Sequence, residues 1–122
     1  MSTPQIFDSE YKFCLLLWDL QPINSTKLVQ VCRDKLGWSK ATTYTVIRRL
    51  SERGVVKNEN SIVTALVSKE DVQKARMENL MEETFQGSIP AFIAAFSRSR
   101  KLSRQEVEQL QNLIDSFEEG ES

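Results

Sequence analysis

The stretch WSKATTYTVIRRLSERG, from Trp38 to Gly54, predicts one amphipathic helix with polar chemistry on its outer side. Ser39 is of a residue type that caps the start of a helix, and Gly54 is of the type that follows its end. At 100° per residue, the inner side collects Thr43, Ile47 and Leu50, with Val46 at its margin. The outer side collects Ala41, Thr42, Thr45, Arg48, Arg49 and Glu52.

Two further helices are expected before this stretch. We expect Ser9 to cap a helix from Glu10 to about Leu20, where apolar residues recur at helical steps until Pro22 blocks continuation. Ser25 is expected to cap a second helix, which ends at Gly37. The predicted inner faces are Tyr11, Cys14, Leu15 and Trp18, with Leu17 at the margin, and then Leu28, Val29, Cys32 and Leu36.

The pattern changes after Gly54 to two short runs typical of strands. Val55–Lys57 and Ile62–Val67 are separated by a polar turn over residues 58–61, which predicts a hairpin. Three helices followed by a hairpin is the chain order of a winged helix-turn-helix domain. We therefore expect a mainly α protein with this domain in residues 1–68 and its third helix suited to the major groove of DNA.

The outer side of the third helix has the chemistry of a base-reading surface. Arginine can pair with two acceptors of a guanine edge or hold a phosphate, and threonine can hydrogen-bond to a base or contact a thymine methyl group. Backbone N–H groups at the start of the helix, together with a lysine, favour a phosphate. The candidate DNA-binding residues are Ser39, Lys40, Ala41, Thr42, Thr45, Arg48 and Arg49. An ordinary solvated helix face is the alternative.

The charges are distributed unevenly along the chain although its net charge is only −1. Residues 1–69 carry ten Lys and Arg against six Asp and Glu, whereas residues 70–122 carry six against eleven. A basic front half indicates contact with a polyanion, and an acidic back half indicates another role.

Helical patterns continue through residues 69–122. Ser68 and Asp71 resemble a capping box before a helix from Lys69 to about Gln86, a short apolar segment covers Ile89–Phe96, and Ser103 with Glu106 caps a last helix. Helices with continuous apolar stripes need a partner surface, and a second copy of the chain is the simplest one. The predicted dimerisation residues are Leu80, Met81, Phe85, Phe92, Phe96, Val107, Leu110, Leu113, Ile114 and Phe117. A monomer whose back half folds onto its own winged helix is the alternative.

The residue pattern resembles the penicillinase repressor family (BlaI/MecI/CopY type). The residues that carry the resemblance are Glu10, Trp18, Trp38-Ser39, Thr42, Thr45, Ile47, Arg49-Leu50, Gly54, Leu102-Ser103 and Glu106. The resemblance covers nearly the whole chain. It implies a homodimeric transcriptional repressor whose winged helix binds a dyad operator in double-stranded DNA, with Thr42, Thr45, Arg48 and Arg49 as operator contacts.

The resemblance also implies a mode of regulation. In the penicillin-responsive branch of the family, a receptor-linked protease triggers cleavage before a phenylalanine in the dimerisation region, and the matching bond here is Ala95–Phe96. The alternative is that Phe92, Ile93 and Phe96 only form interface core. The turn from Asn58 to Ser61 departs from the family because it is short and lacks a basic tip, which puts wing contact with DNA in doubt.

Other classes of function find little support. With no histidine and no glycine-rich phosphate loop, no enzyme, cofactor or metal site is expected. A site made only of carboxylates, from Glu82, Glu83, Glu118 and Glu119, stays open beside the reading of solvated helix faces. Cys14 and Cys32 are expected to be buried free thiols, with a redox switch as the alternative. The longest apolar run, Phe13–Trp18, is too short for membrane insertion, so a cytoplasmic protein is expected. A winged helix that binds only other proteins is the competing function.

Overall fold

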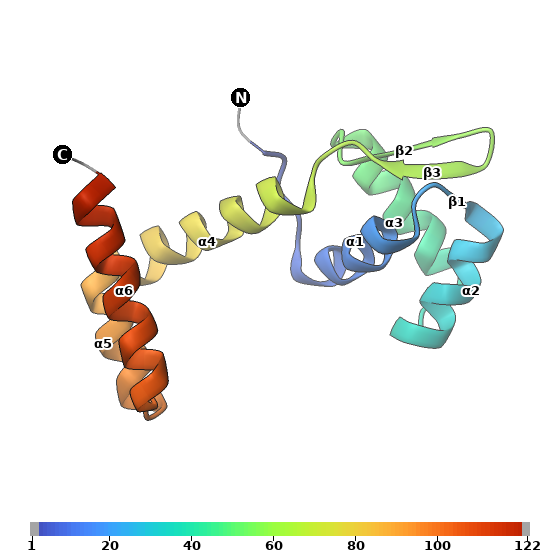
Figure 1. The fold of residues 1–122 in the computed structure, drawn as a ribbon. Helices are drawn as coiled ribbons and strands as arrows, with labels where there is room; N and C mark the ends of the chain where they lie inside the picture. The colour runs from blue at the N-terminus through green and yellow to red at the C-terminus, as the bar shows by residue number, and fades with distance from the viewer. Residues whose placement is uncertain (1–2, 121–122) are drawn as a thin grey trace. The chain divides into compact units, whose positions relative to one another are not determined.

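The computed structural model describes residues 3–120, with side chains up to Phe117 (Figure 1). The elements of this part are α1 (Asp8–Leu20), β1 (Ile23–Asn24), α2 (Ser25–Leu36), α3 (Lys40–Glu52), β2 (Val56–Glu59), β3 (Ile62–Ala65), α4 (Lys69–Phe85), α5 (Ile89–Ser99) and α6 (Arg104–Gly120). The chain divides into two compact units, and the division falls inside α4 between Met77 and Glu78. The predicted class, mainly α with an N-terminal winged helix and further C-terminal helices, is confirmed.

The first unit is the winged helix. Its three strands form an antiparallel sheet in the order β1-β3-β2, with Val63 of β3 paired to Ile23 on one side and to Asn58 on the other. The hairpin turns at Asn60 and Ser61, whose φ angles of 52° and 64° match the turns that favour tight hairpins. Because β2 continues to Glu59, the turn is shorter than the predicted 58–61.

Two predicted helix caps are wrong. Ser9 lies inside α1, and the Glu10 side chain instead accepts a hydrogen bond from the Phe7 N–H over 2.9 Å. Ser25 lies inside α2, because Asn24 accepts from the Thr26 N–H over 2.8 Å and is the actual cap. Both helices therefore begin before the predicted first residue, at Asp8 and at Ser25, and of the two only α2 has a side chain that caps a helical N–H group.

The predicted inner face of α1 is also partly wrong. Phe13 and Leu17 are fully buried, whereas Leu15 is only half-buried. Other elements contact α1 on more than one side, including α2 and β3, so its apolar run is buried over a wider arc than a surface helix would be. The predicted inner residues of α3 are all buried. Val46, Ile47 and Leu50 join one core with Ile6, Phe13, Cys14, Leu17, Leu28, Cys32, Val55, Val56, Val63 and Val72.

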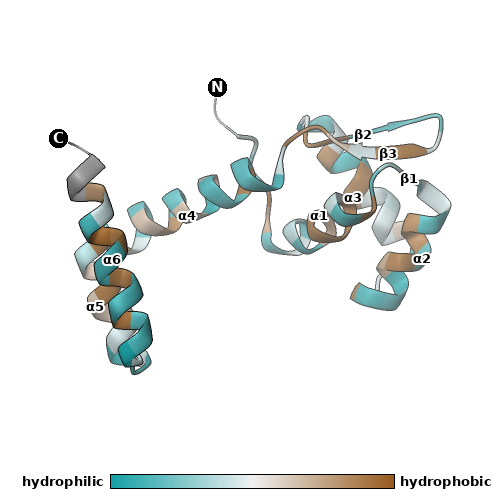
Figure 2. Cartoon of the chain, in the orientation of Figure 1, coloured by the Kyte–Doolittle hydropathy of each residue, from teal (hydrophilic) through white to brown (hydrophobic). Residues whose placement is uncertain are grey.

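The second unit begins at Glu78 and contains the end of α4 with α5 and α6. The apolar segment predicted for Ile89–Phe96 is an eleven-residue helix, because Ser88 caps it and Pro90 stands in its first turn. α6 starts with the predicted capping box of Ser103 and Glu106. Among the described side chains, none after Val72 is buried. Apolar bands remain visible on α5 and α6 (Figure 2).

Candidate nucleic-acid interface

The outward face of α3 is held in place from behind by the core. Ser39, Lys40, Ala41, Thr42, Arg48 and Arg49 are exposed, and Thr45 is half-buried beside them. Behind this face, Thr43, Ile47 and Leu50 are buried, which fixes the rotation of the helix about its axis. Six of the seven predicted contact residues therefore lie on α3 and the seventh, Ser39, is its cap, and all but Thr45 are exposed.

Hydrogen bonds order the first turn of α3. The Ser39 hydroxyl accepts from the Thr42 N–H over 3.1 Å and donates to the Thr42 hydroxyl oxygen over 3.0 Å. The Thr43 hydroxyl donates to the Ser39 carbonyl over 3.1 Å. Trp38, just before the cap, stacks on Phe13 with 6.1 Å between ring centres. These contacts fix the direction in which the first turn points, and the Thr42 O–H still has its proton to donate outward.

A hollow between α2 and α3 adds residues that the sequence interpretation missed. It has a volume of about 190 Å³ and is lined by Thr26, Val29, Gln30, Arg33, Lys40 and Tyr44. The hydroxyl of Tyr44, which lines the hollow, donates to Ser25 over 3.2 Å and so links α3 to α2. Two cationic side chains, Arg33 and Lys40, suit this hollow to a phosphate. Polar residues at 26, 30 and 33 share one face of α2, and that spacing could have identified them.

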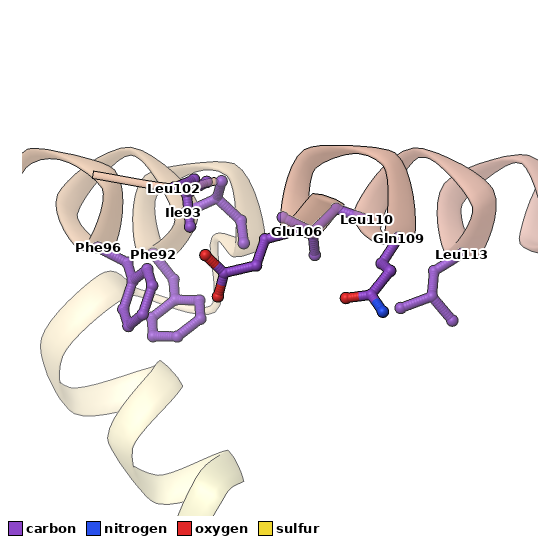
Figure 3. Close-up of a pocket in the computed structure, with 8 residues that line it drawn as sticks. All are labelled: Phe92, Ile93, Phe96, Leu102, Glu106, Gln109, Leu110 and Leu113. Atoms are coloured by element: carbon purple, nitrogen blue, oxygen red, sulfur yellow. The ribbon is translucent and has the colours of Figure 1, made fainter. Parts of the chain in front are cut away.

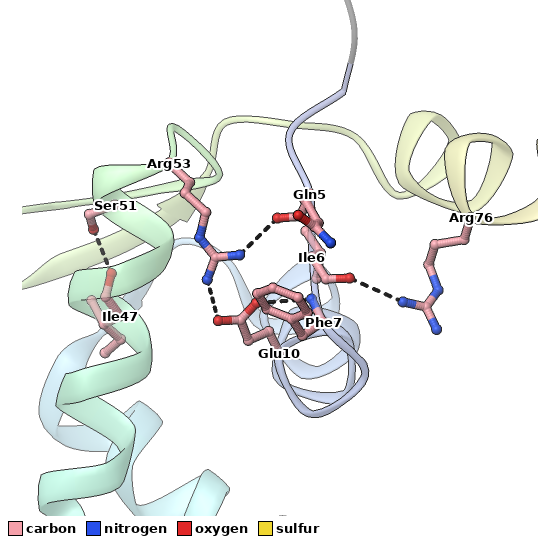
Figure 4. Close-up of polar contacts among 8 residues, drawn as sticks. All are labelled: Gln5, Ile6, Phe7, Glu10, Ile47, Ser51, Arg53 and Arg76. Carbon is pink, nitrogen blue, oxygen red and sulfur yellow. Dashed lines mark hydrogen bonds and ion pairs between the residues drawn. The ribbon is translucent and has the colours of Figure 1, made fainter. Parts of the chain in front are cut away.

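Arg53 is the one arginine of the quoted stretch that turns away from this face. Its guanidinium pairs with the buried carboxylate of Glu10 and donates to the Gln5 carbonyl over 2.9 Å (Figure 4). It also lies 5.2 Å from the centre of the Phe7 ring. Arg53 therefore anchors the end of α3 to the residues around the start of α1, which distinguishes it from Arg48 and Arg49.

The hairpin offers little net positive charge to a polyanion. Lys57 pairs with Glu59 over 3.3 Å, and both side chains are exposed. A shallow hollow of about 310 Å³ runs along this face, lined by Lys57, Glu59, Asn60, Ile62 and Thr64. Because a neighbouring carboxylate offsets the lysine, this hairpin attracts phosphates less than the basic face of α3.

The second unit has an apolar groove of about 300 Å³ between α5 and α6 (Figure 3). It is lined by Phe92, Ile93, Phe96, Leu102, Glu106, Gln109, Leu110 and Leu113. A backbone hydrogen bond from Ser103 is the main cause that lowers the pKa of Glu106 at the rim, and Arg100 pairs with it over 2.7 Å. Of the ten predicted dimerisation residues, six are exposed: Leu80, Phe96, Val107, Leu113, Ile114 and Phe117. The others, Met81, Phe85, Phe92 and Leu110, are half-buried.

The cysteines and acidic residues form no further site in the described part of the chain. Cys14 and Cys32 are buried free thiols, as predicted. Burial, followed by the charge of Glu10, raises the pKa of Cys14 to about 12. No cluster of three or more His, Cys, Asp or Glu among the described residues could hold a metal ion, and the side chains of Glu118 and Glu119 lie outside that part. None of the described helices is both long and apolar enough to cross a membrane.

Comparison with known proteins places this geometry in context. The family model described as "Penicillinase repressor" matches residues 6–116. The methicillin resistance regulatory protein MecI of Staphylococcus aureus strain Mu50 is 24% identical over 117 residues, which cover 93% of this chain and 95% of that protein. The solution structure of the DNA-binding domain of the repressor BlaI superposes with a TM-score of 0.52 at 24% identity, over 58% of this chain and 93% of that one. The monomeric form of Bacillus licheniformis BlaI, solved in complex with the blaP half-operator, superposes with a TM-score of 0.51 at 25% identity over the same shares.

Proposed function

This chain belongs to the penicillinase repressor family, as its residue pattern predicted, and on that premise we propose that it binds a palindromic operator as a homodimer and represses transcription. The family consists of DNA-binding transcriptional repressors and not of enzymes. The observation that carries the proposal is the face of α3, where cationic and hydroxyl side chains are exposed directly opposite a fully buried core side. A repressor of this kind acts on DNA, so we also propose that the protein is cytoplasmic.

The proposed contacts divide into two kinds. Thr42, Thr45, Arg48 and Arg49 would face base edges in the major groove, with Ala41 allowing close approach. Ser39 and Lys40, with Arg33 across the hollow, would hold phosphates and set the register of the helix on the duplex. The paired charges of Lys57 and Glu59 favour a hairpin that contributes little to binding.

Dimerisation through the second unit is supported by its lack of a closed core. Since none of its described side chains is buried, its apolar residues gain most by covering one another in a second copy. Each large apolar side chain buried in this way contributes about 1.5 to 3 kcal/mol, and a two-fold interface contains each residue twice. Five or six such residues per protomer therefore contribute about 15 to 36 kcal/mol, against an association cost of roughly 4 to 15 kcal/mol. In a two-fold dimer the two α3 helices would meet half-sites about 34 Å apart, or a multiple of that distance.

The experiment that tests the proposal selects bound duplexes from random DNA with the purified protein. We expect a palindromic sequence whose affinity falls steeply with salt, because phosphate contacts release counterions. Arg49→Ala should weaken binding to that sequence by about 1 to 3 kcal/mol. Lys35→Ala is the matched control, because Lys35 is an exposed cation of α2 that does not line the hollow. Failure to enrich any sequence would favour a winged helix that binds only proteins.

Relief of repression by cleavage at Ala95–Phe96 is the finer part of the proposal. The bond lies within α5, where Ala95 is half-buried and Phe96 is 38% exposed at the edge of the groove. Cleavage would detach α6 from each protomer, and two linked half-site contacts would become two weak independent ones. Mass spectrometry of the protein from cells treated with a β-lactam should detect a fragment that ends at Ala95. Intact protein in cells whose operator is derepressed would exclude cleavage as the signal.

A further inference from the structure

The segment that precedes α1 is held by two arginines from different elements (Figure 4). Arg53, at the end of α3, donates to the carbonyl of Gln5 over 2.9 Å. Arg76, on α4, contacts the next carbonyl, that of Ile6, over 3.4 Å. The Ile6 side chain is buried in the core of the winged helix. This segment therefore bridges the recognition helix and the helix that leads out of the domain.

Arg76 makes two further contacts, both with α1. Its guanidinium donates to the Asp8 carboxylate over 3.0 Å and lies 4.1 Å from the centre of the Tyr11 ring. One turn earlier, the Gln73 side chain donates to the Tyr11 hydroxyl over 3.1 Å. A planar guanidinium held by a carbonyl, a carboxylate and an aromatic face has its direction fixed by all three.

Arg76 lies on α4 between a residue buried in the core and the boundary of the first unit. The buried Val72 anchors the start of α4 in the core of the first unit. Arg76 lies one turn further on, next to the boundary between the two units, and Met77 beside it is already 57% exposed. Among the hydrogen bonds and ion pairs of the described residues of the first unit, those of Arg76 lie nearest to this boundary along α4.

We propose that Arg76 is a positioning residue that fixes the direction in which α4 leaves the winged helix, and that it thereby determines which spacing between operator half-sites the dimer accepts. The inference rests on the proposed function, since it needs a dimer on a palindrome. Val72 and the Gln73–Tyr11 hydrogen bond both hold the first turn of α4, so they leave the helix able to pivot about that turn, whereas Arg76 holds α4 one turn further along and restricts this movement. When α4 cannot pivot, the dimer holds its two recognition helices at one separation and at one rotation relative to each other.

A role in stability alone accounts poorly for this arrangement. The side chain of Asp8 is 92% exposed and that of Arg76 35% exposed. Ion pairs as accessible to water as this one contribute little to folding. Loss of Arg76 should therefore leave the winged helix folded. Its effect is expected in the direction of α4, on which the carbonyl, carboxylate and aromatic contacts act together.

The test compares Arg76→Gln with Lys74→Gln, which removes an exposed charge from the same helix. Affinity is measured for a single half-site and for palindromes, taken from the selection above, whose spacer is changed by one or two base pairs. Each base pair turns the second half-site by about 35°, so wild type and Lys74→Gln should lose about tenfold or more per step. Arg76→Gln should bind the half-site as wild type does, yet its preference among spacers should shrink to about twofold. Arg76→Lys, which keeps the charge without the planar fork, should fall between them.

The outcomes separate this inference from the proposed function. Wild-type protein that binds neither half-site nor palindrome would contradict the proposed function itself. Wild-type protein with a sharp spacer optimum that Arg76→Gln retains would overturn the positioning role alone. Loss of half-site binding in Arg76→Gln would also overturn it, since the residue would then be required by the winged helix.

Discussion

Phe117 on α6 offers a quantitative test of the dimer, because 72% of this residue is exposed in the single chain. Complete burial of a phenylalanine side chain contributes about 1.5 to 3 kcal/mol, so covering the exposed 72% would contribute about 1.1 to 2.2 kcal/mol. A two-fold interface contains the residue twice. Phe117→Ala should therefore weaken the dimer by about 2.2 to 4.3 kcal/mol, which raises its dissociation constant by roughly 40- to 1,400-fold. The lower part of that range is expected, because alanine keeps one methyl group.

Sedimentation equilibrium over a dilution series measures this dissociation constant directly. Asn112→Ala is the matched control, since Asn112 is exposed on the polar side of the same helix. It should leave the dissociation constant within about twofold of the wild-type value, because surface substitutions away from a contact cost little. Circular dichroism of each variant would show that α6 remains helical. If Phe117→Ala dissociated no more readily than Asn112→Ala, or if the wild-type protein were monomeric at micromolar concentration, the proposed interface would be wrong.

Four further predictions concern the winged helix. Glu59→Gln should strengthen DNA binding by a few fold in a low-salt titration, because it removes a carboxylate near the phosphates and frees Lys57; unchanged affinity would mean that the hairpin stays away from DNA. Burial raises the pKa of both Cys14, to about 12, and Cys32, so neither thiol should react with a disulfide reagent at pH 8 until denaturant is added. The contribution of Cys14 to stability is then complete below pH 9 and is lost as the pH rises toward 12, which chemical denaturation at graded pH would measure. Leu50→Ala should lower the free energy of unfolding by about 2 to 5 kcal/mol, and a smaller loss in urea titration would mean that the core behind α3 repacks.

The sequence predicted the elements whose signal is local. The cap of the third helix at Ser39, its buried side and its end before Gly54 were predicted correctly. Each of these features depends on residues within the helix itself or directly beside it. The same reasoning failed at Ser9 and Ser25, where several hydrogen-bond acceptors stand close together. Which acceptor caps a helix depends on the residue at which the helical backbone begins. Asn24 belongs to β1, which pairs with β3, so α2 begins at the next residue and Asn24 is its cap.

Contacts between distant segments were beyond the reach of the sequence. β1 is two residues long and exists only through its pairing with β3, so it leaves no alternating pattern to detect. The sequence predicted no role for Arg53, because its partners, Glu10 and the Gln5 carbonyl, lie more than forty positions away along the chain. The α2 side of the hollow was missed for a different reason: Thr26, Gln30 and Arg33 have helical spacing, but only the packing of α2 against α3 brings them beside Lys40.

Methylation interference on the selected duplex tests the central claim most directly, because methylation of guanine N7 blocks the major groove and leaves the minor groove unchanged. We predict two symmetric groups of guanines, centred about one helical turn or a multiple of it apart, at which methylation prevents binding. In Arg49→Ala, at least one guanine of each group should lose its effect. Binding that is insensitive to N7 methylation at every guanine, or an identical pattern in wild type and Arg49→Ala, would contradict the assignment of α3 as the helix that reads the operator.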